Sequence, residues 1–319
     1  GEQRDRITAM LATSGELDLK SKAILEIFEN PEIRKFADWD QNRFERQISG
    51  VAVEMLKQDT DLAARWVKDL PPGNARAWAI KNVASNWGHW RGPNGNSVAP
   101  DAHPPTTWSP SENVQWKVEI PGSGTGSPVV WGDQVFVVTA VPAEDSKQLA
   151  EKPRTNLFQS TVGPLPELEF QLLCFDRSTG ASRWRQTAVV ATPHQGTHVS
   201  HGFASASPCT DGEHVYAHFG SRGIYCYTMD GELVWKRDDL GKMKIQFGFG
   251  EGSSPTIADD KIIIPWDHQG DSYILALNKQ TGEQVWKTPR DEPSCWGTPL
   301  VVQHGSDKQI VIVFILLFF

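Results

Sequence analysis

Three histidines lie within eight residues in the segment HQGTHVSH, at positions 194, 198 and 201. Imidazole is the commonest transition-metal ligand of proteins, so His194, His198 and His201 are the candidate metal ligands of this chain. Their spacing matches no established metal motif. Because histidines are often simply exposed, we expect a loop between two strands here and no bound metal.

A second polar segment, WDHQGD at 266–271, brings together Asp267, His268 and Asp271. Two carboxylates and an imidazole could form an acid/base set. The segment lies between two β-rich runs, and aspartates in such turns commonly accept hydrogen bonds from backbone amides. We therefore expect a turn with a solvated histidine rather than a catalytic group, and we keep the three residues as part of a candidate ligand-binding loop.

The glycine-rich stretch FGFGEGSS, at 247–254, adds Glu251 to these loop candidates. It precedes a strand instead of a helix and lacks the Lys-Ser/Thr pair of phosphate-binding loops, so phosphate binding is not expected. We interpret it as a connection between sheets. Glu251 is its one side chain of functional interest.

No stronger catalytic or cofactor signal appears. The chain has no G-x-S-x-G segment and its carboxylates are dispersed, so no catalytic residue is assigned. The cysteines contain no C-x-x-C and no adjacent pair, which predicts neither a zinc site nor a disulfide framework. Four are present, Cys174, Cys209, Cys226 and Cys295. Cys174 and Cys226 share a register with Ala276, which indicates small buried side chains.

Composition excludes further classes. The 319 residues carry a net charge of −8 without any cluster of Lys and Arg, which argues against nucleic-acid binding. The apolar run at 310–319 is too short to cross a bilayer, which needs about 20 residues. The chain begins at Gly1 without a signal segment, so we expect a processed or partial sequence.

The tryptophans recur at a fixed distance from a turn. DRSTGASRW, MDGELVW and NKQTGEQVW each place a tryptophan four residues after a glycine, and Trp184, Trp235 and Trp286 follow one another at intervals of 51 residues. Glycine suits a turn that needs positive φ. The predicted members of this structural set are Trp116, Gly180, Trp184, Gly231, Trp235, Gly282 and Trp286.

The elements that carry these residues change character along the chain. Residues 4–87 have helical periodicity, with amphipathic stripes at 60–70 and 74–87, which predicts an N-terminal segment of helical hairpins. A cluster of Gly, Pro and Asn at 88–100 marks a boundary. We therefore predict two domains, 1–87 and 88–319, the first α-helical and the second all-β.

The second domain repeats a unit of four short antiparallel strands. Each unit begins with a Ser-Pro or Thr-Pro hairpin and ends with the strand pair around the glycine turn. Units of this length are typical of β-propeller blades, in which large side chains fill the space between neighbouring sheets. The sequence contains three complete blades and part of a fourth. We thus predict an incomplete β-propeller that missing blades would complete.

The D/N-x-x-T-G-x-x-x-W units resemble the PQQ-like repeat of quinoprotein-dehydrogenase-type β-propellers. In style the closest resemblance is to non-enzymatic envelope propellers similar to the lipoprotein B of the β-barrel assembly machinery, especially those of planctomycete-type bacteria. WRGPNGNSVAP and FGEGSSPTI also carry this likeness. It implies tryptophan docking between blades and a periplasmic or cell-envelope location.

This resemblance implies a non-catalytic scaffold that binds a protein or peptide. One alternative is a redox enzyme related to the PQQ-dependent dehydrogenases, and another is a carbohydrate-binding propeller, which 13 tryptophans would suit. In the quinoprotein dehydrogenases PQQ is held by an adjacent cysteine pair, a tryptophan floor and calcium. This chain has no such pair, so we expect no cofactor and favour a protein that is not an enzyme.

Overall fold

The computed structural model describes residues 86–93, 95–99, 104–144, 146, 164–305 and 307–313. The chain divides into two units, Gly1–Asn86 and Trp87–Phe319, and the described residues lie almost entirely in the second. The predicted helical hairpins of residues 4–87 fall outside the described residues, apart from the last two positions. The apolar residues 314–319 also fall outside them.

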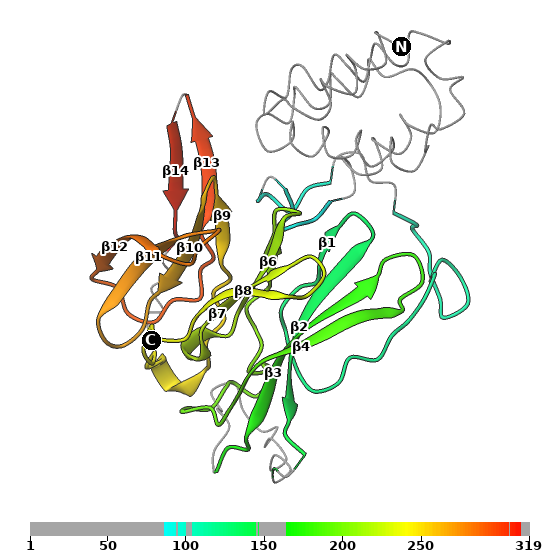
Figure 1. Ribbon diagram of the computed structural model, residues 1–319, viewed down its shortest axis with the longest axis horizontal. Coiled ribbons are helices and arrows are strands. Elements are labelled where there is room, and N and C mark those ends of the chain that lie inside the picture. The colour runs from blue at the N-terminus through cyan, green and yellow to red at the C-terminus, as the bar shows by residue number, and fades with distance from the viewer. Residues whose placement is uncertain are drawn as a thin grey trace, which may run out of the picture. The chain divides into compact units, whose positions relative to one another are not determined.

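The described part is mostly β, built from four-stranded antiparallel sheets as the repeats predict (Figure 1). In each sheet the strands pair in chain order. The first sheet contains β1 (Val129–Trp131), β2 (Gln134–Pro142), β3 (Leu168–Asp176) and β4 (Ser182–Ala191). The second contains β5 (Cys209–Thr210), β6 (His214–His218), β7 (Ile224–Thr228) and β8 (Leu233–Arg237). The third contains β9 (Thr256–Ala258), β10 (Lys261–Trp266), β11 (Ser272–Asn278) and β12 (Gln284–Arg290).

The two middle strands of each sheet are almost wholly buried, whereas the fourth strand alternates between exposed and partly buried residues. β6 is buried at all five positions, and β12 is exposed at five of its seven. A strand whose two faces are both covered by neighbouring sheets carries a continuous run of apolar residues. An outer strand has one face open to solvent, so polar and apolar residues alternate along it. The burial gradient therefore runs from the inner strands to the outer edge of each sheet.

Neighbouring sheets pack face to face through two apolar clusters. The first joins the first and second sheets and includes Phe136, Phe170 and Tyr225, all essentially inaccessible to solvent. The second joins the second and third sheets around Tyr216 and Trp266. The first strands β1, β5 and β9 lie next to one another in that order. A series of such sheets with adjacent inner strands is a propeller-like arrangement.

A fourth unit contributes only a hairpin to the described residues. It consists of β13 (Leu300–His304) and β14 (Asp307–Val311), and β13 lies beside β9 of the third sheet (Figure 1). Its second strand is mostly exposed. The hairpin therefore occupies the place of the first half of another blade.

Helical structure is scarce among the described residues. It is limited to two single turns, η1 (Gly220–Arg222) between β6 and β7 and η2 (Gln246–Gly248) before β9. None of the described helices has the length and apolar character needed to cross a membrane.

The segment that enters the β unit crosses the inner strands of all three sheets. Trp87 exchanges backbone hydrogen bonds with Val130 of β1, and the carbonyl of Gly88 accepts from the amide of Thr210 in β5. The His89 Nε2 lies 3.1 Å from Thr256 Oγ1 in β9. Residues 87–89 are therefore attached to the first, second and third sheets in succession.

Candidate functional site

Three of the predicted tryptophans lie over a glycine of the following turn. A Cβ added to Gly180, Gly231 or Gly282 would come within 2.7–2.8 Å of the indole of Trp116, Trp184 or Trp235, respectively. Each indole also donates a hydrogen bond to a backbone carbonyl of that turn. The pairs are Trp116–Arg177 at 2.8 Å, Trp184–Met229 at 3.0 Å and Trp235–Lys279 at 2.9 Å. Trp286 is only partly buried, and none of the described glycines has the Trp286 indole among its nearest neighbours.

The local backbone explains the shape of the turn that receives each indole. Asn278 Oδ1 accepts from the amides of Gln280 and Thr281, which folds the chain back, and Gly282 completes the turn with φ at +73°. Asp176 closes the first sheet's turn in the same way. An Asx residue followed by glycine in the left-handed region is a favoured turn chemistry.

A register shift between the third and fourth strands accompanies the tryptophan in every sheet. The shift comes directly after the third-strand residue that pairs with the tryptophan. These pairs are Cys174–Trp184, Cys226–Trp235 and Ala276–Trp286. β-Bulges of this kind re-aim a side chain. The predicted shared register of Cys174, Cys226 and Ala276 is thus confirmed.

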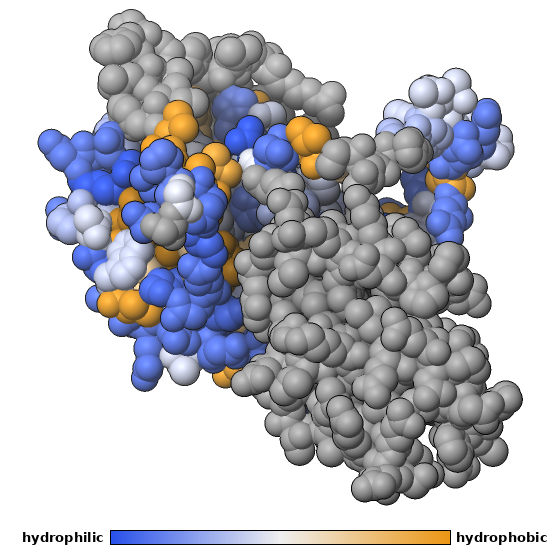
Figure 2. All heavy atoms as spheres, turned by 90° about the horizontal axis from the view of Figure 1, so that it is seen from above, coloured by the Kyte–Doolittle hydropathy of each residue, from blue (hydrophilic) through white to orange (hydrophobic). Residues whose placement is uncertain are grey.

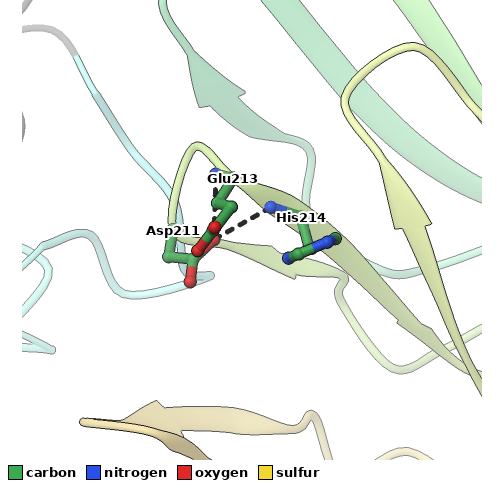
Figure 3. A group of neighbouring side chains, drawn as sticks. All are labelled: Asp211, Glu213 and His214. Carbon is green, nitrogen blue, oxygen red and sulfur yellow. Dashed lines mark hydrogen bonds between the residues drawn. The ribbon is translucent and has the colours of Figure 1, made fainter. Parts of the chain in front are cut away.

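One group of three metal-type ligands occurs among the described residues, at Asp211, Glu213 and His214 (Figure 3). The Asp211 carboxylate is already engaged. Its Oδ1 accepts from the amides of Glu213 and His214, and its Oδ2 lies 2.7 Å from the Lys279 ammonium. A nearby ammonium repels a cation, so we interpret Asp211–Lys279 as an ion pair that joins the second and third sheets.

The three histidines of the first candidate motif do not converge on one point. The His194 Nε2 lies 2.7 Å from the Met243 carbonyl, which indicates an N–H donor. The His198 ring packs edge-on against Phe249, with the ring centroids 5.1 Å apart. His201 is exposed, and its ring centroid lies 5.9 Å from that of His198.

Glu251 anchors the turn between β6 and β7. Its buried carboxylate accepts from the amide and hydroxyl of Ser221 and lies 2.6 Å from an amino group of Arg222. The Arg222 guanidinium in turn lies 5.4 Å from the centre of the Phe170 ring in the first sheet. The stretch expected to be a plain connection is therefore tied by Glu251 into the packing of neighbouring sheets.

Asp267, His268 and Asp271 separate in the structure. Asp267 is buried and pairs with Arg290, Nε to Oδ1 2.9 Å, instead of closing its own turn as expected. The Nδ1 of His268 accepts from the Lys244 amide at 3.3 Å, and Asp271 is exposed. Desolvation of its buried carboxyl raises the pKa of Asp267, although Arg290 opposes the shift.

Glu251 and Asp267 meet in a small cavity between the second and third sheets. Its volume is about 10 Å³, roughly the space of one water molecule. His218, at the end of β6, also lines it and is 2% exposed. Burial lowers the pKa of this imidazole to about 4. The cavity is the candidate functional site, because buried titratable groups with shifted pKa values gather there.

Sequence reasoning found two of these residues and missed the others. His218, Arg222 and Arg290 belong to no motif, and each becomes significant through a contact with another sheet or loop. The one signal for His218 was a histidine inside the apolar strand HVYAH. Nothing in the sequence marked the two arginines.

Residues 169–312 match the family model of the outer membrane protein assembly factor BamB. The match extends from β3 to β14 and confirms the resemblance to PQQ-like repeats predicted from the glycine and tryptophan spacing. No curated protein matches the chain.

The solved structures that match part of this chain include two dehydrogenases and a BamB. A europium-containing methanol dehydrogenase is 16% identical over 53% of this chain, with a TM-score of 0.32, and BamB from Moraxella catarrhalis is 23% identical over 44%, with a TM-score of 0.27. The quinohemoprotein alcohol dehydrogenase ADHIIG from Pseudomonas putida HK5 is 14% identical over 68%, with a TM-score of 0.36. The chain spans 26%, 38% and 28% of these proteins, respectively, well under two thirds of each.

The described residues do not fit the PQQ cofactor of the quinoprotein dehydrogenases. All four cysteines are free and buried, three in strands and Cys295 in the segment after β12, and no two are adjacent in the chain, so no adjacent pair could hold a quinone. The cavity of about 10 Å³ is also far too small for a tricyclic ring system. We therefore assign no quinone chemistry to this site.

Proposed function

We propose that the chain is a non-catalytic propeller scaffold that binds a protein or peptide in the bacterial periplasm or cell envelope. The match of residues 169–312 to an outer membrane assembly factor carries this proposal. The poor fit to PQQ supports a binding role over a redox enzyme. Within this proposal residues 1–87 form a separate helical domain that offers a second interaction surface, and residues 88–319 form the propeller.

We further propose that the β domain is an incomplete ring of three blades and part of a fourth. Support comes from the two-stranded β13–β14 unit and from the partial burial of Trp286 in β12. Propellers close so that sheet faces are not left bare. Further blades, from a longer chain or a second molecule, would supply the turn that receives Trp286.

The outer strands are the surface proposed for partner binding. β4, β8 and β12 are edge strands, and they carry exposed apolar side chains at Val190, Leu233 and Val285. An exposed edge with apolar anchors can add a strand from an extended peptide. Figure 2 shows that the orange patches on the visible face are small and separated by hydrophilic residues.

Site-specific crosslinking tests this proposal. A photoreactive residue is placed at Leu233 or Val285, and the protein is mixed with envelope extract of the source bacterium. Val114, which is exposed outside the outer strands, gives the matched control. We expect one discrete crosslinked protein from both strand positions and none from position 114. Equal crosslinking from all three positions, or from none, would contradict the proposal.

A further inference from the structure

The titratable side chains that line the cavity between the second and third sheets come from four separate segments. His218 ends β6, Asp267 follows β10, Glu251 precedes β9 and Cys295 follows β12. The segments come together only when the two sheets pack. The cavity is thus a product of the fold rather than of one loop.

Two residues that line the cavity each carry a hydrogen-bond acceptor that has no partner among the described residues. The Nδ1 of His218 lies 3.3 Å from the carbonyl of Ser253 and donates to it, which leaves Nε2 as a lone-pair acceptor. Oδ1 of Asp267 accepts from Arg290, whereas Oδ2 has no partner. Both residues are more than nine-tenths buried. Buried polar atoms without partners are rare because each is costly, so this pair requires an explanation.

The charged side chains that line the cavity are all carboxylates. Two carboxylates line it, those of Glu251 and Asp267, and no lysine or arginine does. Arg222 and Arg290, which pair with these carboxylates, are not part of the wall. His218 adds a neutral imidazole with its lone pair available. The cavity wall therefore offers acceptor atoms and two carboxylates, each shared with an arginine outside the wall, but no cationic donor of its own.

We propose that this cavity binds a primary ammonium group. An ammonium supplies three donors on one compact atom and carries the positive charge that the carboxylates favour. The ammonium head group is about as large as the one water molecule for which the cavity has space. A free small amine and the side chain of a lysine from a bound peptide share this chemistry. The proposal is independent of the protein-binding role, because a free amine would satisfy it.

A metal ion fits the site less well than an ammonium. Metal centres need three or four converging ligand atoms. Among the described residues such a group occurs only at Asp211, Glu213 and His214, away from this cavity wall. The residues that line the cavity carry two unpaired acceptor atoms, on His218 and Asp267, and the Glu251 carboxylate is already hydrogen-bonded. This set suits a ligand that donates hydrogen bonds.

Titration followed by ¹⁵N NMR of the His218 side chain tests the proposal. The probe is methylammonium chloride. Methanol, which keeps the size but has a single donor and no charge, and tetramethylammonium, which keeps the charge but has no donor, are the matched controls. We expect a saturable shift of the His218 Nε2 resonance with methylammonium, at the millimolar affinity typical of very small ligands. An equal response to methanol or tetramethylammonium, or no response to methylammonium, would overturn the proposal.

A second titration separates the two sources of the ammonium. Nα-acetyl-lysine methylamide presents the same group on a side chain. Tighter binding of this compound than of methylammonium identifies a lysine of a peptide, and weaker binding identifies a free small amine. Failure of both compounds to bind contradicts the proposal as a whole.

The variant Asp267→Asn examines the pocket directly. Its amide oxygen can still accept from Arg290, while its NH₂ group replaces the unpaired acceptor with a donor. We expect methylammonium affinity to fall about tenfold or more, since a hydrogen bond to a charged group is lost. Asp239→Asn, an exposed aspartate that pairs with Arg237, is the control and should leave the affinity unchanged. Unchanged binding by folded Asp267→Asn would overturn the assignment, and His218→Gln provides an independent test if that variant does not fold.

Discussion

Trp235 and Trp286 occupy the same position in successive sheets, yet their surroundings differ. Each pairs with a small residue of the third strand, Cys226 or Ala276. Trp235 is 8% exposed because the turn at Gly282 lies against its ring, whereas no described turn covers Trp286, which is only partly buried. The comparison shows that the following sheet, rather than the tryptophan's own sheet, completes its burial.

The largest expected difference concerns the two indoles themselves. Trp235→Ala should lower the free energy of unfolding by about 3–5 kcal/mol, because it removes a large buried side chain and its hydrogen bond. Trp286→Ala should cost roughly 1 kcal/mol, since less of its surface is buried. Urea denaturation measures both values. Equal losses would show that burial by the next sheet is not what stabilises Trp235.

A second comparison concerns two ion pairs that each join neighbouring sheets. Lys279→Met leaves the buried Asp211 unpaired between the second and third sheets, and we expect a loss of about 3 kcal/mol in unfolding free energy. Lys308→Met removes the exposed pair with Asp259, which connects β14 with the third sheet, and should change stability by less than about 1 kcal/mol. Chemical denaturation of the two variants side by side gives the difference. Similar effects would indicate that burial does not set the strength of these contacts.

Gly282, which lies against the Trp235 ring, provides a further test of how tightly the next sheet covers this indole. Gly282→Ala places a Cβ 2.7 Å from the indole in a left-handed backbone, and we expect a loss of about 2 kcal/mol. Gly241→Ala has a similar positive φ but no heavy atom within 4 Å, so only the backbone strain of about 1 kcal/mol remains. Thermal denaturation of both variants separates the clash from the strain. A loss at Gly241 as large as that at Gly282 would remove the argument for tight contact with the ring.

The most gradual effect is expected in the pH dependence of the seam between the second and third sheets. Burial lowers the pKa of His218 to about 4, so between pH 6.5 and 4 the unfolded chain binds a proton there that the folded chain does not. Stability is therefore lost as the pH falls through this window, with a slope below the one-proton limit of about 1.4 kcal/mol per pH unit. Nearby Glu251 favours the protonated imidazole and Arg222 opposes it.

His218→Leu should flatten this part of the stability profile. His89 has a similarly lowered pKa of about 4, but it is present in both proteins, so the difference between the two profiles reports His218 alone. Urea denaturation at several pH values between 4 and 7 provides the measurement. Parallel profiles for the wild type and the variant would contradict a buried neutral imidazole.

The sheets could be predicted from the sequence because their causes are local and repeated. Asp176 and Asn278 close their own turns, and Gly282 adopts a conformation that other residues rarely enter, so spacing along the chain was sufficient. The hairpin at 298–313 followed from the same pattern and is confirmed. The helical prediction for residues 4–87 stays a prediction.

The cavity could not be predicted because its causes are not repeated. His218 holds the position, two residues past the pairing with the inner strand, that Val138 and Pro265 hold in the other sheets. Because His218 is the one polar residue at a position that is apolar in the other sheets, no repeat in the sequence points to it. The partner of Asp267 is Arg290 at the end of β12 in the same sheet, and the pairing of β11 with both neighbouring strands brings the two together. Motif spacing therefore identified the loop residues Glu251 and Asp267 but did not predict their ion-pair partners.

The path of residues 87–89 has a mechanical consequence. A strand at the edge of a sheet can peel away one hydrogen bond at a time, but this segment is fastened to three sheets at one level. Tension that arrives along the chain through Trp87 is consequently shared among three inner strands. Detaching this segment requires its contacts with Val130, Thr210 and Thr256 to yield almost together, so the β unit should resist pulling from this side more than its single hydrogen bonds suggest.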